Sequence, residues 1–145
     1  MRERPPDYSD HIRTRIEAGR NIPAVRYIQA LALRGPLLKE FLDTTMADAD
    51  VILTPAIPVP IPTLAESDVE GTGPDVLALV GRLSKFTRPF NLIGVPAISI
   101  PCGFDRHGLP IAFQAVGRPF SEAALLQLAH AYQQATGIHL RAPEL

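Results

Sequence analysis

Proline constrains this chain more than any other residue type. The 145 residues include 15 prolines, about twice the ordinary usage of roughly 5%. Because proline lacks a backbone N–H and clashes with the preceding turn, regular helices and strands must lie mostly between the prolines. Pro55, Pro58, Pro60 and Pro62 follow one another so closely that they predict an extended, polyproline-like loop. This loop continues through an acidic stretch to Gly73 and is long for a compact domain.

Composition and charge exclude several classes of protein. Hydrophobic residues make up 46% of the chain and charged residues 20%, which indicates a core-forming protein rather than a disordered one. The net charge of −1, without blocks of like charge, indicates neither a nucleic-acid partner nor an anionic membrane partner. The sequence shows no apolar run long enough for a membrane span and no secretory signal. With one cysteine, we expect a cytoplasmic protein that forms a single domain over residues 1–145.

Four helices are predicted from capping residues and apolar spacing. They cover Asp10–Gly19, a stretch from Pro23 to Met46, Pro74–Phe86, and a final helix from Ser121 to Gly137. The second has an apolar stripe at i, i+3 and i+4 spacing, which is typical of a helix packed on one side. Pro36 within it predicts a kink or a break into two helices.

Three strands are predicted between these helices. Asp50–Thr54 is a short, β-branched apolar run, which is typical of a strand buried on both faces. Pro96–Pro101 and Ile111–Val116 are joined by a short segment with a turn at Asp105–Gly108, so we expect them to pair antiparallel. The order of elements indicates an α/β fold in which a mixed β-sheet is covered by helices.

The residues show no complete nucleophilic site. Lys85 adjoins Ser84, but neighbours on a helix do not face each other, so a solvated helix face is the simpler interpretation. Cys102 precedes Gly103 at a predicted strand end, where a buried structural thiol is favoured over a Cys/His nucleophile. No G-x-S-x-G motif and no glycine-rich phosphate loop occur in the sequence.

The acidic residues and the histidines do not indicate a particular catalytic or metal site either. Asp48 and Asp50 lie at a helix-to-strand turn, where capping explains them. Glu66, Asp68 and Glu70 fit a solvated loop. The four histidines form no i, i+4 pair, so we predict no metal site and no cofactor.

Three stretches together carry a family resemblance. They are D-V-I-L-T-P at Asp50–Pro55, F-T-R-P-F-N-L-I-G-V-P-A-I-S-I-P-C-G at Phe86–Gly103, and G-L-P-I-A-F-Q-A-V-G-R-P-F at Gly108–Phe120. From about Asp10 to Gly137 the chain resembles the C-terminal third of the amidase signature family. This family comprises amide hydrolases and includes the A subunit of glutamyl-tRNA amidotransferase.

The resemblance implies a fold of helices around a large mixed sheet, of which this chain supplies one part. It also implies hydrolysis of carbon–nitrogen bonds, without a cofactor, by a lysine, a bridging serine and a nucleophilic serine. Family members carry these three in an earlier Gly/Ser-rich segment, which this chain lacks. We therefore assign no catalytic residue and expect the isolated chain not to hydrolyse amides.

The longest stretch also contains the candidate substrate-binding residues. Pro89 and Pro96 are expected to fix extended backbone on either side of a loop, and Gly94 permits a conformation closed to other residues. Asn91 can hold the turn through its own backbone. Such a loop can form a rigid wall of a substrate cleft, the alternative being a purely structural crossover.

By resemblance, the substrate-binding candidates are Ser84, Thr87, Phe90, Asn91 and Arg15. In the glutamine-using members of the family, an aspartate occupies the position of Ser84 and contacts the amino-acid substrate, so Ser84 argues against a glutamine-specific site. An arginine of the first helix serves a similar purpose there, and Arg13 is the alternative to Arg15. The complete enzyme would act on a small-molecule amide.

The expected burial of the strands predicts that another protein segment or chain covers them. Ile52, Ile98 and Ile100 lie in strands that are expected to be buried on both faces, and three strands do not supply enough neighbours. We expect a complementary N-terminal amidase segment to cover them. The alternative is a non-catalytic, homo-oligomeric binding or structural module derived from an amidase. An independent enzyme that uses Cys102 is a third hypothesis.

Overall fold

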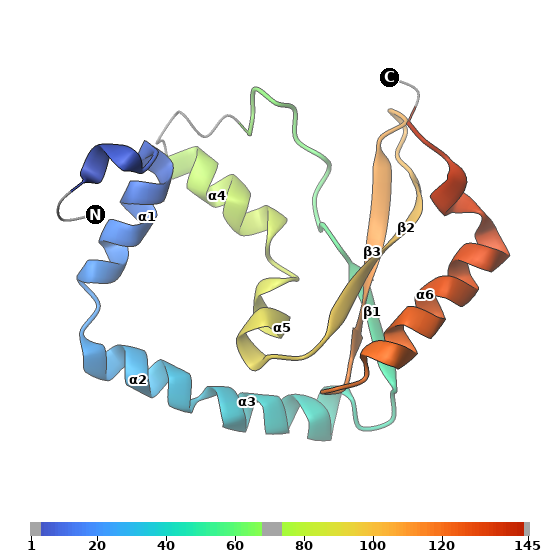
Figure 1. The fold of residues 1–145 in the computed structure, drawn as a ribbon, viewed down its shortest axis with the longest axis horizontal. Helices are drawn as coiled ribbons and strands as arrows, with labels where there is room; N and C mark the ends of the chain where they lie inside the picture. Colours follow the sequence, from blue (N-terminus) through green and yellow to red (C-terminus); the bar gives the residue numbers. More distant parts are fainter. Residues whose placement is uncertain (1–3, 68–73, 144–145) are drawn as a thin grey trace.

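A computed structural model describes residues 4–67 and 74–143 of the chain (Figure 1). It contains six α-helices and three strands in these residues, besides short 3-10 turns at Pro5–Asp7 and Ile138–Leu140 and a π-helical turn at Phe41–Thr45. The helices and strands follow in the order α1 (Asp10–Arg20), α2 (Ala24–Ala32), α3 (Arg34–Glu40), β1 (Val51–Pro55), α4 (Pro74–Leu83), α5 (Arg88–Ile93), β2 (Ala97–Phe104), β3 (Pro110–Gly117) and α6 (Glu122–Thr136).

The three strands form one antiparallel sheet in the order β1-β3-β2. Ile98 of β2 pairs with Ala115 of β3, and Leu53 of β1 pairs with the same alanine from the other side. The α/β class and the antiparallel β2–β3 hairpin are confirmed. Both pairings of the described strands are antiparallel, so the prediction of a mixed sheet is wrong for this part of the fold. For β2 and β3 the reason is that their short link leaves no room for a parallel crossover.

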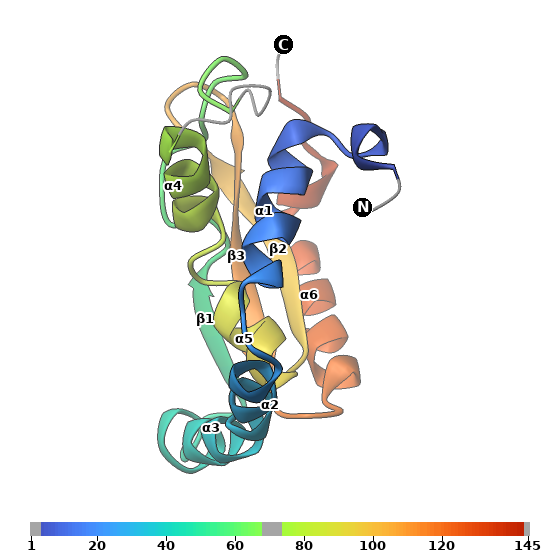
Figure 2. The ribbon, with the colours of Figure 1, turned by 90° about the vertical axis from the view of Figure 1, so that its left-hand side faces the viewer.

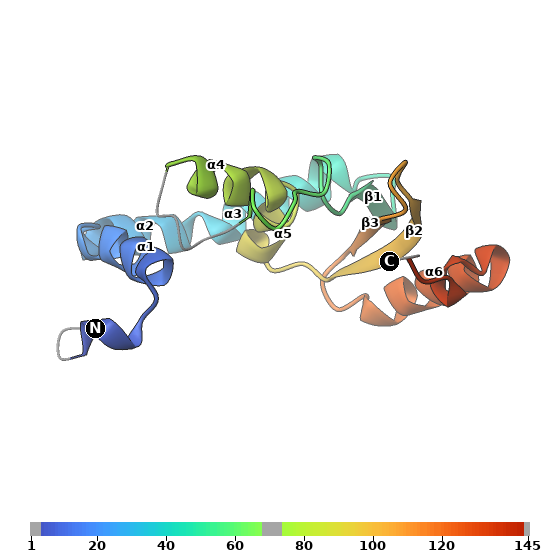
Figure 3. The ribbon, with the colours of Figure 1, turned by 90° about the horizontal axis from the view of Figure 1, so that it is seen from above.

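Helix α6 covers one face of the sheet and forms the core with it (Figure 3). The fully or nearly fully buried members of this core are Ile100, Ala115, Leu125 and Ala129. At its margin the rings of Phe113 and Tyr132 meet edge to face, with centroids 5.1 Å apart. The predicted apolar stripe of the last helix is thereby confirmed from Leu125 to Tyr132.

The long helical stretch breaks at Leu33, as Pro36 predicts. A proline clashes with the carbonyl four residues before it, and α2 ends at Ala32. Pro36 then lies in the first turn of α3, where its missing N–H costs no helical hydrogen bond. After α3 the chain winds into the π-helical turn.

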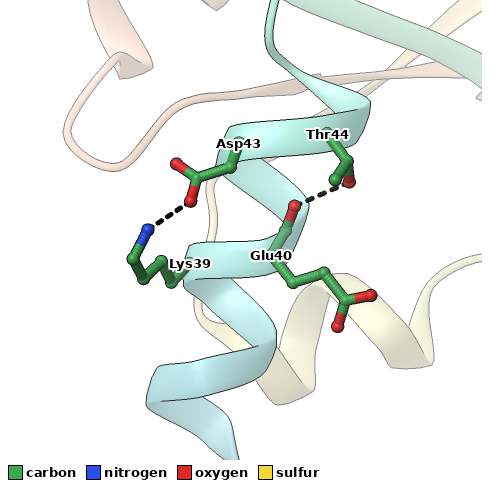
Figure 4. A network of polar contacts seen from close by, with 4 residues as sticks. All are labelled: Lys39, Glu40, Asp43 and Thr44. Carbon is green, nitrogen blue, oxygen red and sulfur yellow. Dashed lines mark hydrogen bonds and ion pairs between the residues drawn. The ribbon is translucent and has the colours of Figure 1, made fainter.

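Polar contacts within the helical stretch hold this turn (Figure 4). The hydroxyl of Thr44 donates to the carbonyl of Glu40 at 2.7 Å, and Lys39 pairs with Asp43. Beyond the turn, Met46 is fully buried, and Arg118 donates to its carbonyl oxygen. The entrance to β1 is therefore fixed to the connection between β3 and α6.

The first part of the apolar stripe of the second predicted helix is not packed against other described residues, contrary to expectation, whereas Met46 at the end of the stripe is buried. Val25 is 59% exposed, Ile28 63% and Leu31 44%. The reason is visible in Figures 1 and 3, where α1 and α2 stand apart from the sheet, while Figure 2 shows α2 and α3 at the bottom of the molecule. Periodicity identifies an apolar face, but among the described residues no element packs over this one.

Strand β1 is likewise not buried on both faces, which corrects the prediction. Leu53 is 59% exposed although its partner Ala115 is fully buried. Paired residues share a face of an antiparallel sheet. Helix α6 packs mainly over β2 and β3, and of β1 it is Val51 that packs against this core. β1 is an edge strand of the described sheet, and such an edge offers free pairing groups.

The predicted turn at Asp105–Gly108 closes the β2–β3 hairpin. The Asp105 carboxylate accepts hydrogen bonds from the backbone N–H groups of His107 at 2.8 Å and Leu109 at 2.9 Å. Gly108 has a φ of +77°, which glycine adopts without strain. The bond from Leu109 is the main cause that lowers the pKa of Asp105 below its ordinary value, with the bond from His107 adding to it and partial desolvation opposing it.

This geometry predicts a pH dependence of the hairpin. A carboxyl group with a lowered pKa stabilises the folded state fully above its ordinary pKa of 3.8, and this contribution is lost as the pH falls through the lowered value. We expect Asp105→Asn, which keeps an acceptor but no charge, to flatten the fall in stability below about pH 4. Urea unfolding of both proteins across acidic pH checks this. Parallel curves for the two proteins would contradict it.

No helix within residues 4–67 and 74–143 combines the length and the apolar character that crossing a membrane requires.

Candidate substrate-binding groove

The segment after α4 forms a helix, not the extended loop that the prolines suggested. α4 ends at Leu83, short of the predicted end at Phe86, and after a turn α5 begins at Arg88. Pro89 lies in the first turn of α5, where its fixed φ favours a helix. The prediction of extended backbone at Pro89 was therefore wrong. Gly94 ends α5 with a φ of +76°, which confirms its special conformation.

Helix α5 packs against α3 and the π-helical turn that follows it. The rings of Phe41 and Phe90 meet edge to face, with centroids 6.0 Å apart. Arg34 Nε donates to the carbonyl of Leu92 at 2.5 Å. A Cβ at Gly94 would lie 3.3 Å from the Arg34 guanidinium, so the helix end and the arginine approach closely. These contacts give a six-residue helix a fixed position that its own length would not supply.

Gln114 fixes the other side of this segment. Its side chain is buried, with 4% of the residue exposed. Nε2 donates to Thr54 Oγ1 and to the carbonyl of Phe86, both at 2.8 Å. One carboxamide thus joins β1, β3 and the link between α4 and α5. Sequence reasoning missed this role; the available signal was a single polar residue inside the apolar run of β3.

A groove of about 1160 Å³ lies between this segment and the sheet. Its floor includes Ala97, Ser99 and Gln114, on the face of the sheet opposite the α6 core. One wall comes from α4, α5 and the link between them, and the other from the proline-rich loop after β1. The hairpin turn at Asp105–His107 also lines it.

Four of the five predicted substrate-binding residues line this groove: Ser84, Thr87, Phe90 and Asn91. The Ser84 hydroxyl donates to the carbonyl of Val80 at 2.6 Å, and the Thr87 hydroxyl donates to the carbonyl of Ser84 at 3.2 Å. Asn91 is exposed on α5, and its backbone N–H donates to the carbonyl of Thr87.

The predicted arginine belongs to the first helix. Arg15 belongs to α1, and its side chain is outside the described residues. The alternative, Arg13, forms an ion pair with Asp10 at 2.6 Å. Arg13 is not among the described residues that line the groove.

The remaining candidates for a nucleophile or a metal ligand do not lie in a catalytic arrangement among the described residues. Cys102 is partly buried, not fully, and lies inside β2 rather than at its end, with Sγ 3.6 Å from the Ile111 carbonyl oxygen. Lys85 Nζ lies over the ring of Phe86, 5.8 Å from its centroid. Among the residues that the structure describes, no group of three or more His, Cys, Asp or Glu could hold a metal ion.

The acidic loop residue Glu66 forms a capping box with Thr63. Glu66 Oε2 accepts from the Thr63 backbone N–H at 2.8 Å and from its hydroxyl at 2.9 Å, and the Glu66 N–H donates back to that hydroxyl. The hydrogen bond from the Thr63 backbone N–H is the main cause that lowers the pKa of Glu66, and the bond from the Thr63 hydroxyl lowers it further. Asp68 and Glu70 lie outside the described residues.

Comparison with known proteins identifies the family. The family model for Amidase matches residues 1–126. The chain is 37% identical over 140 residues to the putative amidase AmiD of Mycobacterium tuberculosis, which covers 97% of this chain and 29% of AmiD. It is 34% identical over 131 residues to the fatty acid amide hydrolase of Medicago truncatula, with coverages of 90% and 21%.

Solved structures agree with these matches. A crystal structure described as an amidase superposes with a TM-score of 0.71 at 27% identity, covering 92% of this chain and 30% of that one. The 6-aminohexanoate cyclic dimer hydrolase gives 0.67 at 28% identity, with coverages of 83% and 26%. The chain thus spans about three tenths or less of the length of these relatives. Sequence and fold together show that this chain belongs to the amidase family, as its motifs predicted.

Proposed function

We propose that this chain supplies the scaffold and one wall of the substrate pocket in a hydrolase of small-molecule amides. The nucleophile and the groups that transfer protons would lie on a complementary N-terminal segment, so the chain would be inactive alone. In this proposal residues 1–145 form one partial domain of a cytoplasmic enzyme.

The groove is the observation that carries the proposal. Helix α5 is held from one side by Arg34 and Phe41 and is tied through Phe86 to Gln114 on the other. A wall positioned in this way can orient a substrate, because small displacements of positioning groups reduce rates strongly. Ser84, Thr87, Phe90 and Asn91 would present the wall to the substrate.

The apolar surface of α2 supports a complementary segment. Its large side chains are more than two fifths exposed at Val25, Ile28 and Leu31, and exposed apolar patches mark interaction sites. The amidase relatives are more than three times as long as the region they share with this chain. A segment of the same fold would supply the cover, whereas a homo-oligomer would have to cover the same face with a second copy.

A chimera with AmiD tests the proposal. The 140-residue region of AmiD that matches this chain is replaced with the chain, and ammonia release is measured from small aryl and alkyl amides. We expect the chimera to hydrolyse amides that unmodified AmiD hydrolyses, and the isolated chain to release no ammonia. A chimera that folds with AmiD-like thermal stability but lacks hydrolysis would contradict the proposal.

The same chimera also tests whether α5 contacts the substrate through Asn91. We expect Asn91→Ala to lower kcat/KM by about tenfold, the size of one lost substrate contact. Gln127→Ala is the control, because Gln127 is exposed on α6, the helix on the other face of the sheet. Equal kcat/KM values for the two variants would assign α5 a purely structural role.

A further inference from the structure

The described lining of the groove carries ionisable groups at one turn only. Among the described residues that line it, the ionisable groups are confined to Asp105, Arg106 and His107 in the hairpin turn. The polar side chains elsewhere are hydroxyls and carboxamides: Ser84, Thr87, Asn91, Ser99 and Gln114. No carboxylate or ammonium group from the described lining residues therefore lies along the α5 wall or the sheet floor.

The three ionisable groups are engaged with one another and with their own backbone. The Asp105 carboxylate accepts from two backbone N–H groups. Arg106 Nε donates to His107 Nε2 at 2.9 Å. These groups belong to one short turn and hold it together, so they offer little complementary charge to a ligand seated along α5.

Apolar side chains provide the remaining contact surface. Val80, Leu83 and Phe90 line the wall, and Ile57, Val59 and Ile61 line the facing loop. Burying an apolar group against such surfaces is favourable at roughly 25 cal/mol per Å². A charged group placed there loses water without gaining a charged partner from the described residues of the wall and the facing loop, which is costly.

We propose that the groove binds an uncharged amide that carries an aryl or branched alkyl group. It would discriminate against the same skeleton when that skeleton carries an ammonium or a carboxylate. This inference rests on the proposed function and specifies its substrate class.

A titration of the isolated, ¹⁵N-labelled chain with three matched compounds tests the substrate class. They are 3-phenylpropanamide, the corresponding α-ammonium compound phenylalaninamide at about pH 6, and the carboxylate 3-phenylpropanoate. We expect the neutral amide to shift the side-chain amide signals of Asn91 and Gln114, with a Kd lower by about tenfold or more than that of either charged compound. Comparable binding of a charged compound, absence of binding, or shifts confined to residues outside the groove would overturn the inference.

An isosteric charge change provides a second, independent readout. Asn91→Asp places one carboxylate on the exposed side of α5, with Gln114 as the reporter. We expect phenylalaninamide to bind this variant about tenfold more tightly than it binds the unmodified chain. Gln127→Glu on α6 is the matched control and should leave all three Kd values unchanged. An Asn91→Asp variant that behaves like this control would overturn the inference.

The two proposals fail separately. If the AmiD chimera hydrolyses amides but the titration shows no preference for the neutral compound, the substrate class is wrong and the proposed function stands. If the preference is observed but a folded chimera is inactive, the groove binds as inferred and the proposed function is wrong.

Discussion

Replacing Leu125 with alanine will lower the free energy of unfolding by about 2–5 kcal/mol. Leu125 is 2% exposed and packs between α6 and the sheet with Ile100 and Ala115. Truncation removes apolar contact and leaves a cavity that a helix fixed on a sheet fills only in part. Urea unfolding followed by circular dichroism measures the change.

The neighbouring leucine provides the control. Leu126 is 61% exposed on the same helix, so Leu126→Ala should change the free energy of unfolding by less than about 0.5 kcal/mol. Equal effects of the two substitutions would show that α6 does not pack on the sheet through Leu125, and the described core would then be wrong.

Replacing Gln114 with leucine will lower the free energy of unfolding by about 1–3 kcal/mol. Leucine keeps much of the volume but removes both hydrogen bonds, so the Phe86 carbonyl and the Thr54 hydroxyl each lose a donor. The link before α5 is then no longer tied to the sheet. We also expect the amide protons of α5, such as that of Asn91, to exchange faster with solvent, because local opening becomes easier.

Gln127→Leu is the matched substitution, since Gln127 is exposed on α6. It should leave both the stability and the amide exchange of α5 close to their original values. If Gln114→Leu is as stable as the unmodified chain and α5 exchanges at the same rate, Gln114 does not hold the groove wall.

The elements with clear local signals were predicted well. The helix between Ser121 and Gly137 has an apolar stripe and two terminal residues that mark its bounds, and the structure reproduces both. The β2–β3 hairpin follows from a short link with a glycine in the left-handed region. In these cases the information lies within a few neighbouring residues.

Features that depend on distant residues were missed. Helix α5 is six residues long, too short for a periodic pattern, and Pro89 is compatible both with extended backbone and with a first helical turn. Contacts with Phe41 and Arg34, far away in the sequence, favour the helix. The burial of Val25 and Ile28 was predicted wrongly for a related reason: spacing shows that a face is apolar, not what covers it.

The candidate groove depends both on a local sequence motif and on contacts between distant residues. The sequence motif pointed to Ser84, Thr87, Phe90 and Asn91 through resemblance, and the structure brings all four to one groove. Gln114 was not singled out, because a glutamine inside a strand has no pattern that distinguishes a structural tie from a solvent-facing residue. Its role depends on a backbone carbonyl contributed by the link between α4 and α5.

In the proposed function, this chain forms a wall of an amidase pocket while the nucleophile lies on another segment. Labelling of the AmiD chimera with a fluorophosphonate, which reacts with activated serines, tests it most directly when mass spectrometry locates the adduct. We expect an adduct on a serine contributed by AmiD and no labelling of the isolated chain. An adduct on Ser84, Ser99 or any other serine of this chain would contradict it.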